Sequence, residues 1–403
     1  MTHPTEPSAA KPAAPTAGPG EAGLSSIEGP RSGEGPRIAD GELWIYRLFD
    51  VADAVDLARA EALAAGPSAR VRLDSAQSAT ALQLPSPPLQ ISLGRREVPL
   101  LGGPRVAEAS AHLFDYGVIS LRYRVAIEPG TTLGALVALA GALLERATPA
   151  LDTLARQHAR EVAAALAPAL ARPHAWGGME TYQVFFVRAF EGGPLTAARL
   201  LAEAPVASLL LGETSQVRLS EAERQDVLSH QFSYLETDLA VIHWNSALVV
   251  EPSGVEDVPD LLELATAHLL ELRYYDDLLD RELHRIYDEL EAGGSPLTHL
   301  LTRKYRRLQR RTAALLLELS EMVERLENAV KIVGDFYLAR VYQAAVRRFR
   351  LPSWEATVLR KQRLVAEVND LTGDAADTSR GELLEVVVIL LISYEILAAL
   401  LRH

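Results

Sequence analysis

Two long heptad repeats in the C-terminal part of this chain restrict its fold more than any other feature. In both repeats apolar side chains recur at alternating spacings of three and four residues, and the stretch Gly293–Pro296 separates them. Two such seams joined by a short Gly/Pro turn bury each other only as an antiparallel helical hairpin. The first seam is Leu262, Ala265, Leu269, Leu272, Asp276, Leu279, Leu283, Ile286 and Leu290; the second is Leu301, Tyr305, Leu308, Thr312, Leu315, Leu319, Met322, Leu326, Ala329, Val333 and Phe336.

The rest of the C-terminal region is also expected to be helical. Pro352 begins a helix predicted over Ser353–Leu371, because proline is favoured in a first helical turn. A loop over Thr372–Thr378 follows, and a hydrophobic helix is predicted over 383–401. Residues 253–403 are therefore predicted to form an all-α domain.

The preceding residues 38–252 mix the two periodicities. Runs that alternate or are rich in β-branched and aromatic residues indicate strands, and Ala/Leu runs at helical spacing indicate helices. Such mixing predicts an α+β fold, with a mixed α/β domain ahead of the all-α domain. The expected strands are Glu42–Phe49, Leu89–Leu93, Glu97–Leu101, Thr181–Phe190, Leu239–Val250 and a strand pair or one bent strand over His112–Ala126; the expected helices are Val51–Ala65, Leu133–Arg146 and Leu151–Leu170.

Composition narrows the class of protein. The chain of 403 residues has a formal net charge of −13, which argues against a surface that binds nucleic acid or anionic lipid throughout. It has no cysteine, so disulfides, thiolate metal sites and cysteine nucleophiles are excluded. Residues 1–37 contain seven prolines and six glycines and no apolar stretch, so we expect a disordered tail, no signal peptide and a cytoplasmic location.

An aspartate-rich string is the first candidate for chemistry. Asp276-Asp277-Leu-Leu-Asp280 matches the DDxxD string by which isoprenyl diphosphate synthases hold magnesium diphosphate, and His284 continues the same helical face. Carboxylates on one face suit Mg²⁺ or Ca²⁺, but the synthases use two such motifs and this chain has one. The alternative is a salt-bridged helix face in which Asp276 sets the register of the seam.

Two basic clusters are candidates for binding RNA or lipid phosphate. The first cluster lies between Arg303 and Arg311. A folded hairpin would place its basic side chains opposite residues 278–286, where Asp280 and Glu282 would neutralise many of them. For the second, interleaved aromatics suit single-stranded nucleic acid, but they suit a helix that packs its aromatics inward equally well. The first cluster is Arg303, Lys304, Arg306, Arg307, Arg310 and Arg311; the second is Arg340, Arg347, Arg348 and Arg350, with Tyr337, Tyr342 and Phe349 between them.

The hydrophobic C-terminus raises the question of a membrane anchor. Its nineteen residues approach the ~20 that span a bilayer. Glu395 near the middle costs about 2.5–3.5 kcal/mol on insertion. Apolar residues, among them Val386, Leu390, Ile392 and Leu400, offset that cost. The alternative is a helix packed on the hairpin with Glu395 paired to an arginine.

No catalytic constellation stands out. The ten histidines include no HExxH motif, His230 and His243 are expected to be structural, and Walker A, GxGxxG and GxSxG motifs are absent from the sequence. We therefore predict no catalytic residues and no cofactor, and favour a non-enzymatic protein over an enzyme.

Several strings, in their order along the chain, resemble the "required for meiotic nuclear division" family, also called domain of unknown function 155. They are Phe114–Ile119, Asp238–Val249, Leu272–Asp280, Gly334–Tyr342, Trp354, and Leu384–Ile392 with Glu395. The resemblance covers roughly residues 40–402 and implies an α/β region followed by a helical region, without an assigned enzymatic activity. Eukaryotic relatives are associated with organelles or membranes and with support of mitochondrial translation. This chain lacks a transit peptide, so that role does not transfer directly, and its Ala/Leu/Arg-rich composition favours a bacterial member.

These observations lead to a ranked set of hypotheses. The first is a non-enzymatic scaffold that binds an unidentified protein partner or a second copy of itself, held at the cytoplasmic face of a membrane by its C-terminal helix. The second is a soluble RNA- or ribosome-associated factor, and the third a metal-dependent enzyme at the aspartate-rich helix.

Overall fold

The computed structural model describes residues 35–64, 66–73, 82–145, 148–214, 219–291, 310–317, 319–320, 324, 331–332 and 336–368. Five predicted features lie wholly or largely outside this part of the chain: the N-terminal tail, the turn at Gly293–Pro296, the start of the second seam (Leu301, Tyr305 and Leu308), the loop Thr372–Thr378 and the hydrophobic segment 383–401.

The centre of the fold is a nine-stranded sheet with strand order β10-β11-β12-β9-β1-β7-β6-β5-β3. Neighbouring strands are antiparallel, except that β12 runs parallel to β9. The strands are β1 (Ile38–Asp50), β3 (Ser68–Arg70), β5 (Leu89–Leu100), β6 (Gly103–Leu113), β7 (Val118–Ala126), β9 (Glu180–Phe190), β10 (Gln231–Phe232), β11 (Leu239–Ile242) and β12 (Ser246–Val250).

Both faces of the sheet are buried, and the period of two along each strand divides its side chains between them. On β1, Leu43 and Ile45 belong to one hydrophobic core, whereas Trp44 and Tyr46 belong to the other. Burial on both sides means that polar residues of the central strands, among them Arg47, Arg122 and Gln183, are also buried.

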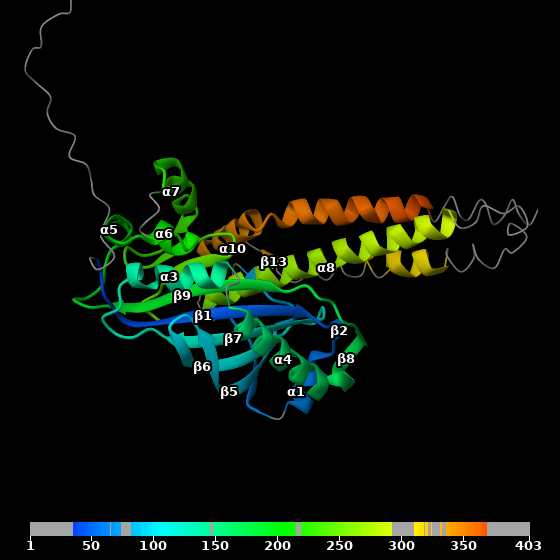
Figure 1. The fold of residues 1–403 in the computed structure, drawn as a ribbon, viewed down its shortest axis with the longest axis horizontal. Coiled ribbons are helices and arrows are strands. Elements are labelled where there is room, and N and C mark those ends of the chain that lie inside the picture. The colour runs from blue at the N-terminus through cyan, green and yellow to red at the C-terminus, as the bar shows by residue number, and fades with distance from the viewer. Residues whose placement is uncertain are drawn as a thin grey trace, which may run out of the picture.

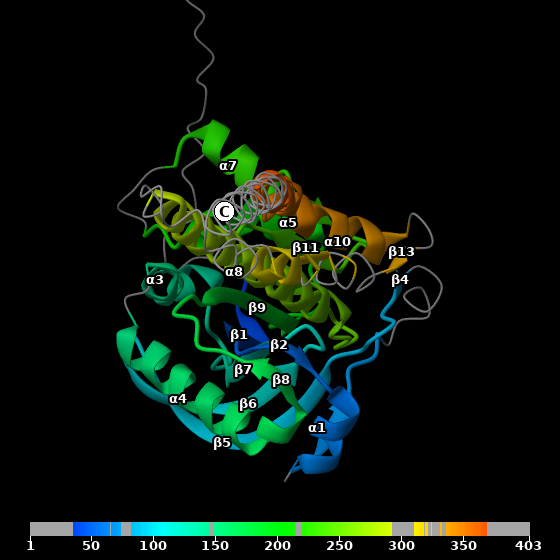
Figure 2. The same cartoon turned by 90° about the vertical axis from the view of Figure 1, so that its right-hand side faces the viewer.

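Helices from the middle of the chain cover the first face. In Figure 2 the sheet curls around α4, which packs on β1, β5 and β7. Helix α3 packs against α6, which in turn contacts β12. The helices of this layer are α1 (Leu57–Leu63), α3 (Leu133–Leu144), α4 (Pro149–Ala165), α5 (Ala197–Glu203), α6 (Val206–Leu211) and α7 (Glu221–Leu228).

The second face is covered by C-terminal helices. Helix α8 (Asp257–Glu291) crosses the sheet with its first half and continues past the edge of the sheet (Figure 1). Helix α10 (Tyr337–Arg348) lies beside it, and a further helix over residues 351–368 runs along the projecting half of α8. We call this projecting unit, made of residues 276–291, 310–317 and 351–368, the arm.

Two small two-stranded sheets join distant segments. Strand β2 (Ala52–Val55) pairs with β8 (Leu170–Pro173), which follows the 3₁₀ turn Ala167–Ala169. Strand β4 (Leu82–Gln83) pairs with β13 (Lys331–Ile332).

The α+β fold class is confirmed, with a mixed sheet-and-helix region followed by helices. The predicted boundary at residue 252 falls between β12 and α8, but the two regions share one core. Leu262 and Leu270 of α8 pack with Trp44 and Phe186 of the sheet.

Several predicted elements differ from the structure. Leu89–Leu93 and Glu97–Leu101, expected as two short strands, form the single strand β5 with an irregularity next to Gly94. The helix predicted over Leu151–Leu170 ends at Ala165, and a 3₁₀ turn and the start of β8 follow it. Val51–Ala65 is a short strand followed by a helix, because the Asp56 side chain accepts a hydrogen bond from the Arg59 N–H and starts α1 there. Leu239–Val250 is a tight hairpin of two strands, not one strand. The second seam was predicted to stay helical to Phe336, but Lys331–Ile332 form a strand, in keeping with the β-branched residues of that stretch.

Candidate functional site

The aspartate-rich string on α8 is held by protein groups. Lys361 Nζ lies 2.6 Å from Asp276 Oδ1 and 2.7 Å from Asp280 Oδ1, so it bridges the two carboxylates that a metal ion would need. Asp277 accepts a hydrogen bond of 2.9 Å from Trp176 Nε1, and His284 Nδ1 lies 2.7 Å from the Asp280 carbonyl oxygen. In the part of the chain that the structure describes, no group of three His, Cys, Asp or Glu side chains is arranged to hold a metal ion.

The first basic cluster is described only at its end. Arg303, Lys304, Arg306 and Arg307 lie outside the described residues. Arg311 Nη2 lies 2.6 Å from Glu282 Oε2, which is the cross-hairpin pairing that the alternative interpretation predicted. Arg310 is exposed.

The second basic cluster divides between solvent and protein partners. Arg340 and Arg347 are exposed on α10, whereas both Nη atoms of Arg348 donate to Asp226 Oδ2 at 3.0 and 3.1 Å. Tyr342 and Phe349 are buried in the core under α8, so the interleaved aromatics at these two positions pack inward.

The anchor candidates Val386, Leu390, Ile392, Glu395 and Leu400 lie outside the described residues. Within the described ranges, no single helix has the length and hydropathy needed to cross a membrane. The bent pair α3 and α4 reaches that threshold together, by length and composition alone.

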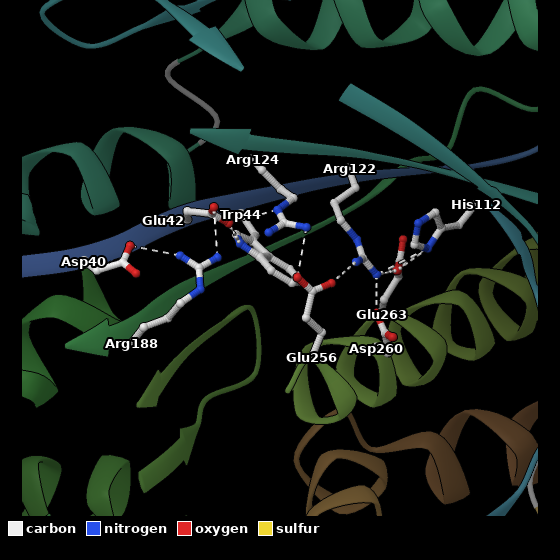
Figure 3. A network of polar contacts seen from close by, with 10 residues as sticks. All are labelled: Asp40, Glu42, Trp44, His112, Arg122, Arg124, Arg188, Glu256, Asp260 and Glu263. Carbon is white, nitrogen blue, oxygen red and sulfur yellow. Dashed lines mark hydrogen bonds and ion pairs between the residues drawn. The ribbon is translucent and has the colours of Figure 1, made fainter. Parts of the chain in front are cut away.

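A buried ionic network fixes the start of α8 to the sheet (Figure 3). Arg122 projects from β7 between the rings of Trp44 and Tyr46, with its Cζ 4.8 and 5.4 Å from their centroids. Its Nη2 donates to Glu263 and, at 2.5 Å, to Asp260 Oδ1. His112 Nδ1 from β6 lies 2.8 Å from Glu263 Oε2. Only 2% of the side chains of Arg122, Glu263 and His112 is exposed, so all three are inside the protein.

The electrostatics of this network act in opposite directions on the pKa values of its two carboxyl groups, Glu263 and Asp260. Burial would raise the pKa of Glu263, but the charges of Arg122 and His112 lower it to about 2. Burial raises the pKa of Asp260 despite the same arginine. The cavity beside the network, lined by His112, Asp260 and Glu263, has a volume of about 10 Å³. That space holds about one water molecule, and the contacts of the network position α8 on the sheet.

The network continues to the surface along β1. Arg124 Nε lies 2.9 Å from Glu42 Oε2, and its Nη1 lies 2.9 Å from Glu256 Oε1 at the start of α8. Arg188 Nη2 lies 2.9 Å from Glu42 Oε1, and its Nη1 lies 3.0 Å from Asp40 Oδ1 (Figure 3). Charge therefore alternates from the protein interior to solvent along the sheet–helix boundary.

A second cluster clamps the middle of α8. His174 Nε2 lies 2.9 Å from Asp50 Oδ1, and its ring stacks on Tyr274 of α8 with centroids 4.5 Å apart. Burial would lower the pKa of His174, but hydrogen bonds to Asp50 and Asp53 raise it to about 9. Burial raises the pKa of Asp50 to about 6. Arg273, one residue before Tyr274, pairs with Glu180 of β9.

A cleft of about 610 Å³ opens between the β11–β12 turn, α7, α8 and the end of α10. Trp244 of the turn lines it and is 59% exposed, and Trp354 lines it from the helix over 351–368. Arg273, Arg348 and Arg350 also face this space. We call it the β11–α10 cleft; its size is that of a small-molecule site.

The sequence contains one local signal for the buried network. Asp260 and Glu263 are spaced to share one face of α8. Arg122 has no such signal, because Ile119, Leu121, Tyr123 and Val125 of β7 alternate with Ser120, Arg122 and Arg124, and a period of two therefore predicts a solvent-facing arginine there. A charge on a buried strand face implies a partner, but only the fold identifies it. His174 had no comparable local signal.

Comparison with known proteins places residues 40–257 in a described family. They match the model for the N-terminal domain of the uncharacterised protein MJ0711. The MJ0711 protein of Methanocaldococcus jannaschii is 24% identical over 184 residues, which cover 44% of this chain. The aligned part spans about half of that relative, 53% of its length. No solved structure matches this chain.

The matched region begins at the third residue of β1 and ends at the first residue of α8, so it contains nearly all of the nine-stranded sheet and the helices on its first face. It stops before Asp260 and Glu263, which complete the buried network. This chain belongs to the family of the uncharacterised protein MJ0711 N-terminal domain.

Proposed function

We propose that the chain is a non-enzymatic scaffold whose arm spaces a folded body from a membrane. The observation that carries this proposal is the path of α8, which is fixed on the sheet by its first half and projects past the sheet with its second half. The projecting part of α8, residues 276–291, is about 24 Å long at a rise of 1.5 Å per residue, so the arm is long enough to act as a spacer.

The contacts along α8 support a stiff arm. Its start is held by the Arg122 network and its middle by His174, Trp176 and Glu180. Beyond the sheet, Lys361 and Arg311 pair with carboxylates of α8. Successive groups of contacts therefore restrain the helix along most of its length.

The direction of the chain supports a membrane tether. The helix over 351–368 starts next to α10 and runs outward, since Lys361 meets α8 at Asp276 and Asp280. Residue 368 therefore lies toward the far end of the arm, and the apolar segment 383–401 follows it in the sequence. We propose that this segment inserts into the bilayer, and that the chain is related to the meiotic-nuclear-division family that its sequence resembles.

Fractionation of full-length protein tests the tether. We expect the protein to stay in the membrane pellet after alkaline carbonate extraction, because the segment 383–401 is almost entirely apolar. Deleting residues 381–403 should move it to the soluble fraction with its melting temperature unchanged. The variant Leu390→Arg, which adds a charge costing about 2.5–3.5 kcal/mol in the bilayer, should do the same. A soluble full-length protein, or a deletion that aggregates, would contradict the tether and favour a helix packed in the core.

The structure also bears on the two other hypotheses, the metal-dependent enzyme and the RNA-associated factor. Two carboxylates on which the metal-dependent enzyme would depend, Asp276 and Asp280, form ion pairs with Lys361, so no observation favours this hypothesis over the scaffold. The RNA-associated factor retains exposed Arg340 and Arg347 and the β11–α10 cleft beside them as the supporting observations.

A further inference from the structure

The β11–α10 cleft combines aromatic, cationic and unpaired polar groups that the scaffold proposal does not use. From these we infer that it is a nucleotide-binding site, for either a free mononucleotide or the terminal nucleotide of a single-stranded RNA. Each part of a nucleotide has a counterpart among the lining residues, and the following paragraphs take them in turn.

The two indoles provide surfaces for a base. Tryptophan is large and usually well buried, yet Trp244 is 59% exposed at the turn between β11 and β12. Trp354 lines the same space, and the Arg273 guanidinium lies 5.6 Å from its ring centroid. Stacking on aromatic rings is the usual way in which proteins hold an unpaired base, because every base has a π face.

Two of the residues that line the cleft, His243 and Asn245, are buried and polar. Asn245 is 8% exposed and its Oδ1 has no hydrogen-bond donor; the Nδ1 of His243, which is 4% exposed, also lacks a hydrogen bond. Burial and the charge of Arg348 lower the pKa of His243 to about 4, so the imidazole is neutral at pH 7. A buried acceptor without a donor is costly, and the amino and ring N–H groups of a base are suitable donors.

The three arginines that line the cleft offer guanidinium N–H groups that can bind a phosphate. Arg273 pairs with Glu180, and Arg348 pairs with Asp226. These ion pairs hold both arginines in place without using all their N–H groups, since Arg348 Nε has no hydrogen-bond partner. In the described residues Arg350 has no ion pair. Guanidinium forks match phosphate oxygens in geometry and charge. The remaining acid of the lining, Glu223, offers oxygens that accept hydrogen bonds from sugar hydroxyls.

The backbone at Arg350 is an independent sign of function. Its φ of +57° lies in the left-handed region, at the junction where α10 ends and the next helix begins. Glycine is the usual residue in such a position after a helix, because a Cβ there is strained. Strain retained at the edge of a cleft indicates that the side chain is needed there.

Isothermal titration calorimetry of the full-length protein tests this site with two probes, AMP and a short 5′-phosphorylated single-stranded RNA. We expect saturable binding of at least one probe, and a loss of about tenfold or more in affinity for Arg350→Gly and for Trp244→Ala. Arg350→Gly should melt at or above the temperature of the unmodified protein because it relieves strain, so lost binding cannot be ascribed to unfolding. Arg172→Gly is the matched control, since Arg172 also has a positive φ, of +46°, but does not line the cleft.

The two probes distinguish the source of the nucleotide. RNA binding at least tenfold tighter than AMP assigns the site to an RNA end, and equal or tighter binding of AMP assigns it to a free nucleotide. The inference is overturned if neither probe binds at millimolar concentration. It is also overturned if Arg350→Gly and Trp244→Ala bind as tightly as the Arg172→Gly control.

Discussion

Arg122→Leu is expected to lower the free energy of unfolding by about 3–5 kcal/mol, because it leaves the buried carboxylates of Glu263 and Asp260 without their cation. Leucine fills much of the same volume between Trp44 and Tyr46, so the cost arises from lost charge and not from a cavity. Urea unfolding followed by circular dichroism measures the change.

Arg124→Leu is the matched control for this prediction. Arg124 is two residues along the same strand, pairs with Glu42 and Glu256, and also lies over Trp44, but its side chain is 24% exposed. Solvent screens its ion pairs, so we expect a loss of about 1 kcal/mol or less. Equal losses in the two variants would show that burial of the network adds nothing to its strength.

The same network predicts how stability depends on acid. The pKa of Glu263 is about 2 in the folded protein and 4.5 without perturbation. Because the folded pKa is the lower one, the stabilisation is complete above pH 4.5 and is lost as pH falls toward 2. Its full size is about 3 kcal/mol. Glu263→Gln should remove this part of the acid dependence, and an unchanged pH profile would contradict the assignment.

Gly117→Ala is expected to cost at least about 4 kcal/mol, which places it among the most damaging single substitutions in the described part of the chain. Gly117 lies in the β6–β7 turn with a φ of +101°, and a Cβ built there would lie 1.6 Å from the Ala52 carbonyl oxygen. The turn cannot move away, since Val51 N donates to Gly117 O at 3.1 Å and Val55 N to Asp115 O at 2.8 Å.

Gly102→Ala separates the effect of contact from that of backbone strain. Gly102 also has a positive φ, of +90°, but no heavy atom lies within 4 Å of a Cβ built on it. We expect this variant to lose about 1–2 kcal/mol, the cost of a left-handed residue alone. Thermal or urea unfolding compares the two, and similar losses would contradict the account of the Gly117 turn.

Long helices and strands could be predicted from the sequence where apolar residues recur at a regular spacing. The first heptad seam predicted most of α8, and the apolar runs predicted most of β1 and β9, because burial imposes regular periods on apolar residues. Short elements were harder to predict. The helices α5 and α7 begin at the N-caps Thr196 and Ser220, but they are too short for a clear apolar repeat.

The candidate sites depend on contacts that no local pattern contains. Arg122 and Asp260 are 138 residues apart, and Arg47 meets Asp152 across 105. The cleft gathers residues from Leu144 to Trp354. From the sequence, Asp276 and Asp280 suggested a metal site because Lys361, their partner, belongs to a helix whose packing only the fold reveals. For the first basic cluster, the predicted pairing with α8 is confirmed at Arg311, which pairs with Glu282, because a helical hairpin fixes which residues face each other.

The central claim is that the sheet and the arm form one rigid body, and distances between two spin labels test it most directly. The chain has no cysteine, so Glu108→Cys on β6 and Asp288→Cys near the end of α8, both at exposed positions, can be labelled without removing other thiols. A rigid arm predicts one narrow distance distribution in the full-length protein, and a broader one when Arg122→Leu is added. A broad or multiple distribution without that substitution would contradict the claim.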